Sequence, residues 1–346
     1  MRSRCGAPRT GIRASGGAWP TRVSKSAHQN DAVAKSTMGS GMRRVPSAPP
    51  QRLNTLIAAS QPLMKPKAGC LALHKMELQF QSFGAFQDSL GPLVNSTRQI
   101  PDCIAVIRQL GIIEPFTNRH VRPEELLIGS ENYRESITAE GCLSRHRAVL
   151  MLLERLYGSP QGLAGERVYL AEALSGFARR LQQWVPDVVL SEYLEGATES
   201  FSDGVRHEDL CALSFADAAF DLVITNELFE HVHSLDAALG EIARVLKPGG
   251  RMICTFPFAY GQHEQIRKAV RHPDDGRVEL LAELELHGDP IRPQQGSMVY
   301  QVSGWSILDQ ARTLGFTWAC MHAIASWKHG VLGGEIPVIF VMEAER

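Results

Sequence analysis

Apolar and polar positions alternate regularly between residues 166 and 258. Apolar runs of strand length occupy residues 167–173, 188–190, 205–210, 220–226 and 251–258. Residues 174–184 and 235–246 instead carry apolar side chains at helical spacing, and the Lys-Pro-Gly-Gly run at 247–250 supplies the signals that end a helix. Residues 220–226 are apolar almost throughout, as in a strand buried on both faces. Strands that alternate with helices predict an α/β fold with a parallel sheet and right-handed crossovers.

The end of the chain departs from this parallel pattern. A helix is predicted at residues 305–314, followed by strands at 317–324 and 336–342. The connection between these two strands contains Gly330, Gly333 and Gly334 and is too short for a helical crossover. The two strands should therefore pair antiparallel, which reverses the final strand of the sheet.

Two further regions flank this core. Residues 76–158 are predicted to form a helical cap beside the sheet, with amphipathic helices at 102–110 and 144–157. Residues 259–303 are polar, contain Gly, Pro and His, and interrupt the core after the strand at 251–258. An insertion at this edge is where substrate specificity usually resides. The predicted division is a tail at 1–75, the cap at 76–158 and the core at 159–346.

Charge is distributed unevenly along the 346 residues. Residues 1–75 contain 13 Lys and Arg and one acidic residue, although the whole chain has 36 basic and 37 acidic residues. This stretch lacks a sustained helical or strand period and is expected to be disordered. It could be a transit peptide, a basic arm that contacts nucleic acid, or sequence upstream of a true start at Met64 or Met76.

The rest of the chain is acidic, which argues against a nucleic-acid site in the core. No run approaches the roughly 20 apolar residues that a membrane span needs. Seven scattered cysteines without a CxxC pair favour a reducing compartment, and a zinc site or disulfide framework is not expected. A cytoplasmic location is expected, with an organelle as the alternative if the tail is a transit segment. The oligomeric state is not predictable from these features.

Acidic residues stand at the ends of the first three predicted strands. These are Glu172, Glu192 and Asp209. In a parallel α/β sheet the ligand lies beyond the carboxyl ends of the strands. The three carboxylates are therefore expected to meet at one ligand site.

A longer run of spaced residues points to a family. It comprises Glu208-Asp209-Leu210, Phe220-Asp221, Glu230-His231-Val232 and Arg244 through Gly250. This pattern is similar, nearly residue for residue, to the type-11 branch of the class I S-adenosylmethionine-dependent methyltransferases. The resemblance implies a Rossmann-like, doubly wound, seven-stranded and mostly parallel sheet with a reversed last strand. It also implies S-adenosylmethionine as cofactor and a small-molecule acceptor, for which a hydroxyl oxygen is the expected methylation site.

The resemblance also assigns the cofactor residues. Glu172, Ala173 and Gly176 would meet the methionyl end, although family members carry three alternate glycines in this turn and this chain keeps only the middle one. Glu192 and Tyr193 would meet the ribose, since an acid about 20 residues after the first turn accepts ribose hydroxyls in related folds. The remaining predicted contacts are Asp209 and Leu210 with the adenine and Asn226 near the sulfonium.

Histidines supply the candidate base. A hydroxyl acceptor needs a base with a pKa near working pH, and His231 follows the fourth strand at the carboxyl edge. His287 is the second candidate base, and His287 and Arg134 are the candidate substrate-binding residues. Each of the three could instead have a structural role. The histidine spacing shows no metal-ligand pattern, so no metal is expected.

Two other functions remain open from the sequence. An NAD-binding Rossmann enzyme would share the topology as far as the third strand, but it should keep the glycines of the first turn. A catalytically degenerate module that binds a ligand without chemistry would explain their loss.

Overall fold

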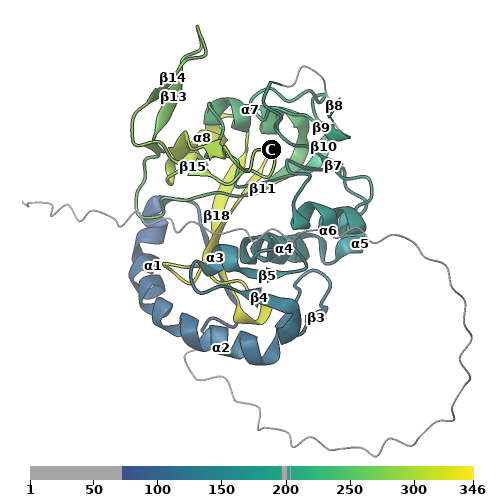
Figure 1. Cartoon of the computed structure of the whole chain (residues 1–346), viewed down its shortest axis with the longest axis vertical. Coiled ribbons are helices and arrows are strands. Elements are labelled where there is room, and N and C mark those ends of the chain that lie inside the picture. The colour runs from purple at the N-terminus through teal and green to yellow at the C-terminus, as the bar shows by residue number, and fades with distance from the viewer. Residues whose placement is uncertain (1–71, 197–200, 203) are drawn as a thin grey trace, which may run out of the picture. The chain divides into compact units, whose positions relative to one another are not determined.

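The computed structural model describes residues 72–196, 201–202 and 204–346 (Figure 1). Most of the predicted tail, residues 1–71, lies outside the described residues. All described residues belong to one of the two units into which the chain divides, Pro62–Arg346. No helix in the described ranges is long and apolar enough to cross a membrane.

A seven-stranded sheet forms the centre of this unit. Its strands, in spatial order, are β1 (Met76–Phe80), β18 (Trp318–Ala325), β19 (Ile339–Glu345), β11 (Leu246–Thr255), β10 (Phe220–Asn226), β6 (Val168–Leu170) and β7 (Val189–Leu190). Strands β7, β6, β10 and β11 are parallel neighbours, whereas β19 runs antiparallel to both β11 and β18. The predicted fold class, with its reversed last strand, is confirmed.

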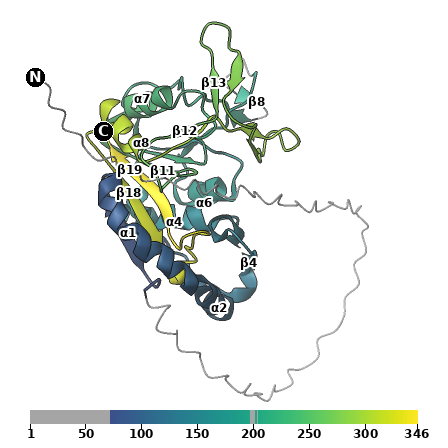
Figure 2. The ribbon, with the colours of Figure 1, turned by 90° about the vertical axis from the view of Figure 1, so that its left-hand side faces the viewer.

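Helices cover both faces of the sheet (Figures 1 and 2). One face packs against α4 (Ser144–Tyr157), α5 (Pro160–Leu163) and α6 (Gly176–Trp184), and the other against α1 (Phe83–Ser96), α2 (Ile100–Leu110), α7 (Leu235–Val245) and α8 (Ser306–Thr313). The apolar run of β10 explains this arrangement, because Leu222 and Ile224 enter one core while Val223 enters the other. A strand with such alternation must be covered on both sides.

The third predicted strand, at 205–210, does not join the seven-stranded sheet. Its first residues form β9 (Val205–Arg206), which pairs antiparallel with β8 (Phe201–Ser202). The residues that follow β9 contact the residues that follow β7 through a parallel bridge between His207 and Glu192. Two backbone hydrogen bonds, from Glu192 N to Arg206 O at 2.9 Å and from Glu208 N to Glu192 O at 3.1 Å, hold it there. Asp209 consequently still lies beside Glu192.

The region expected to be a helical cap is mixed. Its first residues form β1, the antiparallel edge strand beside β18. The region also contains two small hairpins, β2–β3 (Ile112–Ile113, His120–Val121) and β4–β5 (Leu126–Ile128, Ile137–Ala139), and the short helix α3 (Tyr133–Ser136). Short 3₁₀ turns lie at Thr97–Gln99, Pro123–Glu125 and Trp327–His329. The apolar and polar residues at 76–80 alternate over only five positions, which was too short a pattern to predict a strand beside the helical pattern that follows.

The predicted insertion folds as small hairpins at the carboxyl edge. They are built from β12 (Ile266–Arg267), β13 (Ala269–Arg271), β14 (Val278–Leu280), β15 (Leu286–His287), β16 (Ser297–Met298) and β17 (Gln301–Val302). Upstream, the Lys-Pro-Gly-Gly run is a bulge in β11 and lies beyond the helix end: α7 stops at Val245, and both Leu246 and Arg251 pair with β10.

Candidate functional site

A cleft of about 630 Å³ opens beyond the carboxyl ends of β6, β7 and β10. Of the predicted cofactor residues, four line it: Glu192, Tyr193, Asp209 and Leu210. Its opposite wall comes from the insertion, including Asp289, Ser297 and Tyr300. The volume lies in the range typical of small-molecule and cofactor sites. The topology therefore brings two of the three strand-end carboxylates to one cleft.

Glu192 organises the turn that follows β6. Its Oε1 atom accepts hydrogen bonds from the backbone N–H groups of Ala173 and Leu174, at 2.8 and 2.9 Å. Among the described residues, Oε2 accepts no hydrogen bond in the structure, so it remains available to a ligand in the cleft. Burial raises the pKa of Glu192, and the two backbone hydrogen bonds oppose that rise.

Glu172 and Asn226 lie outside the lining of the cleft. Asn226 Nδ2 donates to Glu172 Oε1 at 2.9 Å, and Thr255 Oγ1 donates to Asn226 Oδ1 at 3.1 Å. These bonds tie together the carboxyl ends of β6, β10 and β11. Burial is the main cause of the raised pKa of Glu172, which the nearby Arg145 opposes. The two predicted cofactor contacts are thus engaged with each other behind the cleft.

Gly176 has a packing role in this structure. A Cβ atom at this position would lie 2.3 Å from Gly141 O, because the backbone of Gly141, at φ +78°, packs against it. A glycine lets another backbone segment come very close, and here that segment is the backbone of the cap at Gly141. Ala173 and Gly176 do not line the cleft, and their contact with a cofactor stays a prediction.

The segment after β9 forms a second wall of the cleft. Asp209 Oδ1 accepts from Cys211 N at 2.8 Å, and Leu210 is 7% exposed. The neighbouring Glu208 is a structural anchor: its carboxylate accepts from Arg206 Nε at 2.6 Å and from Ser214 N at 2.8 Å. A carboxylate beside an apolar side chain and backbone groups is suited to the edge and face of a purine.

Arg134 is committed to ion pairs. Its guanidinium donates to both carboxylate oxygens of Glu227, with NH1 to Oε2 at 2.8 Å, and also contacts Glu135. Glu227 lines the cleft whereas Arg134 does not. The arginine holds the pKa of Glu227 low, at about 2, against the effect of burial. Arg134, predicted to bind substrate, is therefore placed behind Glu227.

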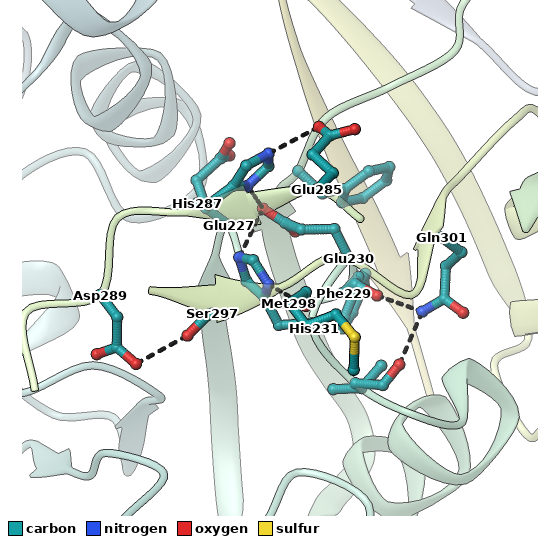
Figure 3. A network of polar contacts seen from close by, with 12 residues as sticks. Glu227, Phe229, Glu230, His231, Glu285, His287, Asp289, Ser297, Met298 and Gln301 are labelled. Atoms are coloured by element: carbon teal, nitrogen blue, oxygen red, sulfur yellow. Dashed lines mark hydrogen bonds and ion pairs between the residues drawn. The ribbon is translucent and has the colours of Figure 1, made fainter. Parts of the chain in front are cut away.

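His231 lies in the lining of the cleft, next to His287 and Glu230 (Figure 3). His231 Nδ1 hydrogen-bonds to Met298 O at 2.8 Å, and its Nε2 faces Glu230 Oε1 at 3.6 Å. His287 Nδ1 faces the same oxygen at 3.7 Å, and the two rings meet edge to face with centroids 5.1 Å apart. The structure thus brings the two predicted histidines together around a buried carboxylate.

Glu227, Glu230 and Asp289 were missed in the sequence. Asp289 Oδ2 accepts from Arg292 Nε at 3.0 Å and from Ser297 Oγ at 2.8 Å, which fixes the loop that faces Glu192. The spacing of Glu227, Glu230 and His231 after a buried strand, together with the His-Gly-Asp-Pro run at 287–290, is a signal that could have identified them.

A parallel core with a reversed β19, and an acid-lined cleft at the carboxyl edge, define an α/β fold in which ligands usually bind beyond the carboxyl ends of the strands. Comparison with known proteins places it within that class: residues 170–254 match the family described as "Methyltransferase domain". That stretch, about a quarter of the chain, is similar to a methyltransferase domain. It spans β6 to β11, the strands whose ends form the cleft.

Sequence relatives are similar over short stretches. The chain is 55% identical over 42 residues to the uncharacterized protein YafE of Escherichia coli, which is 12% of this chain and 20% of that protein. It is 32% identical over 99 residues to the uncharacterized methyltransferase C1B3.06c of Schizosaccharomyces pombe, or 28% of this chain and 31% of that one. The chain therefore matches less than a third of the length of either relative.

Solved structures are similar at lower identity. A S-adenosylmethionine-dependent methyltransferase from Mesorhizobium loti is 15% identical with a TM-score of 0.37, covering 57% of this chain and 97% of that one. The 1,6-didemethyltoxoflavin-N1-methyltransferase of Burkholderia thailandensis is 18% identical with a TM-score of 0.33, covering 58% and 77%.

Proposed function

We propose that this protein transfers a methyl group from S-adenosylmethionine to a hydroxyl oxygen of a small molecule. The observation that carries the proposal is the cleft beyond β6, β7 and β10, lined by Glu192, Asp209 and Leu210 within a methyltransferase domain. The acidic charge outside the N-terminal tail favours a small-molecule acceptor over a nucleic-acid backbone.

The residues of the cleft fit the cofactor. Glu192 Oε2 would accept the two ribose hydroxyls, while Oε1 keeps the turn at Ala173 and Leu174 in place. Asp209 would accept from the adenine amino group, and Leu210 would pack against the ring. Glu172 and Asn226 would act at the methionyl end, which requires their mutual hydrogen bond of 2.9 Å to open toward the ligand.

Methyl transfer needs alignment and the exclusion of water more than it needs acid–base chemistry. The bound cofactor supplies a methyl carbon on a positively charged sulfur; the reaction breaks the S–CH₃ bond, forms an O–CH₃ bond and releases the hydroxyl proton. The insertion residues Asp289 and Tyr300 close the cleft opposite Glu192. His231, in the lining, would hold or relay the released proton.

The test is a labelled-methyl transfer assay. Full-length protein and S-adenosylmethionine labelled in the methyl group are added to a cell extract depleted of large molecules, and labelled products are identified by mass spectrometry. We expect the label on the oxygen of a small molecule. Label on macromolecules alone, or on a nitrogen or carbon atom, would contradict the proposed acceptor class.

A variant of the protein tests the role of His231 in the reaction. His231→Ala should bind S-adenosylhomocysteine within about twofold of the wild type but turn over about 10²-fold or more slowly, the usual range for loss of a general base. Unchanged turnover would mean that His231 has no part in the reaction.

One observation favours a second candidate, a degenerate module that binds a ligand without chemistry. Gly176, which the family would place against the cofactor, is packed against Gly141. The same assay separates the candidates: a degenerate module would bind S-adenosylhomocysteine calorimetrically but leave every metabolite unlabelled.

A further inference from the structure

We propose that Glu230, His231 and His287 bind a divalent transition-metal cation at the floor of the cleft. One ligand atom from each residue lies within 4.8 Å of the others, so that a single ion could reach all three (Figure 3). The three residues come from the loop after β10 and from β15 of the insertion.

The environment of the Glu230 carboxylate indicates that this site binds a ligand. Its side chain is 2% exposed, and neither carboxylate oxygen has a hydrogen-bond partner in the structure. A buried carboxylate without a hydrogen bond is costly, because it has lost the hydrogen bonds that water would donate to it. Both nearby imidazole nitrogens, at 3.6 and 3.7 Å, are too distant to hydrogen-bond to it.

The hydrogen bonds of the two histidines fix which nitrogen faces Glu230. His231 Nδ1 lies 2.8 Å from the carbonyl oxygen of Met298, an acceptor only, so Nδ1 carries a proton. His287 Nε2 lies 3.1 Å from Glu285 Oε1, so this nitrogen also carries its proton. In neutral rings, His231 Nε2 and His287 Nδ1 then present lone pairs to Glu230. Glu230 and Glu285 raise the pKa of His287, so a bound cation would take the place of the proton on His287 Nδ1 and meet three electron-pair donors.

This arrangement matches the coordination of a cation. Two ligands about 2.1 Å from one ion at the tetrahedral angle lie about 3.4 Å apart, close to the observed separations. Metal-bound histidines usually donate their second N–H to a carbonyl or a carboxylate, as Met298 O and Glu285 provide here. Two imidazoles and one carboxylate suit Zn²⁺, Fe²⁺ and related cations and leave coordination positions open.

Of the three residues, His231 lines the cleft and its side chain is 19% exposed, so an open coordination position beside it would face the cleft. A cation there would coordinate the acceptor oxygen and favour loss of its proton to solvent. With its Nε2 atom bound to the cation, His231 would then act as a ligand and not as the base. This role rests on the proposed function, whereas binding of the cation does not. If the cation binds the acceptor, the substrate must carry a hydroxyl group that can coordinate a metal ion, as a vicinal diol does.

The experiment is a titration of metal-depleted full-length protein with Co²⁺, whose visible absorption reports nitrogen and oxygen ligands. We expect saturable absorption at one equivalent. Glu230→Gln and His287→Ala should weaken binding at least about 100-fold. Glu285→Gln, which replaces the charged acceptor of His287 Nε2 with a neutral amide oxygen, should weaken it about 10-fold. His272→Ala is the matched control, since His272 pairs with Glu279 on the β13–β14 hairpin and should bind Co²⁺ as the wild type does.

Two alternative results would overturn the proposal. If no Co²⁺ binds at millimolar concentration, Glu230 is neutralised by protons on the histidines. If Co²⁺ binds but all variants bind it equally, the ion lies elsewhere. Circular dichroism of each variant separates loss of ligands from loss of fold, and the more exposed Glu285→Gln keeps the test valid if Glu230→Gln does not fold. S-adenosylhomocysteine titrated into the same samples reports on the proposed function independently.

Discussion

The strongest prediction concerns Glu192→Ala, because this carboxylate connects the first turn of the sheet to the cleft. The substitution removes the acceptor of two backbone N–H groups, those of Ala173 and Leu174. It also removes the oxygen, Oε2, that is available to the cofactor ribose. S-Adenosylmethionine should bind the wild type with micromolar affinity, about −8 kcal/mol.

The magnitude follows from the hydrogen bonds that are lost. A hydrogen bond to a charged group contributes about 1.5–3 kcal/mol. Two ribose hydroxyls bound by one oxygen should together be worth about 3 kcal/mol, since the other oxygen is already engaged with the turn. Glu192→Ala should therefore raise Kd about 150-fold. Glu192→Gln, which keeps one carbonyl acceptor, should raise it about tenfold.

Isothermal titration calorimetry with S-adenosylhomocysteine measures the effect directly. Asp187→Ala is a matched control, because Asp187 is exposed and lies before β7, away from its carboxyl end. It should leave Kd unchanged, and the melting temperatures of both variants should be compared with the wild type. If Glu192→Ala folds and binds with wild-type affinity, the assignment of the ribose site is refuted.

Three further predictions concern positions where packing or burial stabilises the fold. Gly176→Ala should lower both the melting temperature and the cofactor affinity, because its Cβ would lie 2.3 Å from Gly141 O; thermal denaturation and calorimetry measure this. Arg147→Lys should destabilise the protein by about 2–4 kcal/mol in urea denaturation, because the buried guanidinium donates to four backbone carbonyls and one ammonium cannot replace it. Burial lowers the pKa of His329 from 6.5 to about 4, so the neutral ring stabilises the fold above pH 6.5 and this stability is lost as pH falls toward 4. Between pH 7 and pH 5 the wild type should lose about 2 kcal/mol more than His329→Asn, measured by urea denaturation at each pH.

Each of these predictions has a control and a contradicting outcome. Gly240→Ala meets no atom within 4 Å in α7 and should be harmless; equal effects at both glycines would dismiss the packing argument. Arg179→Lys, at an exposed position, should cost little, and a similar cost at Arg147 would mean that its four bonds do not matter. For His329→Asn, an acid sensitivity equal to that of the wild type would assign the titration to other groups, such as the buried His146.

Much of the fold could be predicted because single elements carry strong local patterns. β10 (Phe220–Asn226) and α4 (Ser144–Tyr157) were predicted at their observed bounds, the first from a run that is apolar almost throughout and the second from a sustained helical period ended by Gly158. Weak patterns failed. The segment at 205–210 carries only two strand residues in β9, and its partners depend on tertiary contacts beyond the end of β7.

The site was predictable only in part, for a related reason. Glu192 was located because strand ends in a parallel sheet meet at one edge. Asp209 lines the same cleft although its segment joins the end of β7 only through the bridge between Glu192 and His207. The partners of Arg134 and of Glu172 could not be foreseen, since Glu227 and Asn226 are distant in sequence and their side-chain directions depend on packing. The grouping of Glu230 with His287 likewise depends on how the insertion folds back over the sheet.

The most direct test of the central claim is a crystal structure of the full chain with S-adenosylhomocysteine. We expect the ribose within hydrogen-bond distance of Glu192 and the adenine between Asp209 and Leu210, with the sulfur toward Asn226 and His231. A cofactor bound elsewhere, or a cleft closed to it by the contact between Glu192 and the turn, would contradict the account.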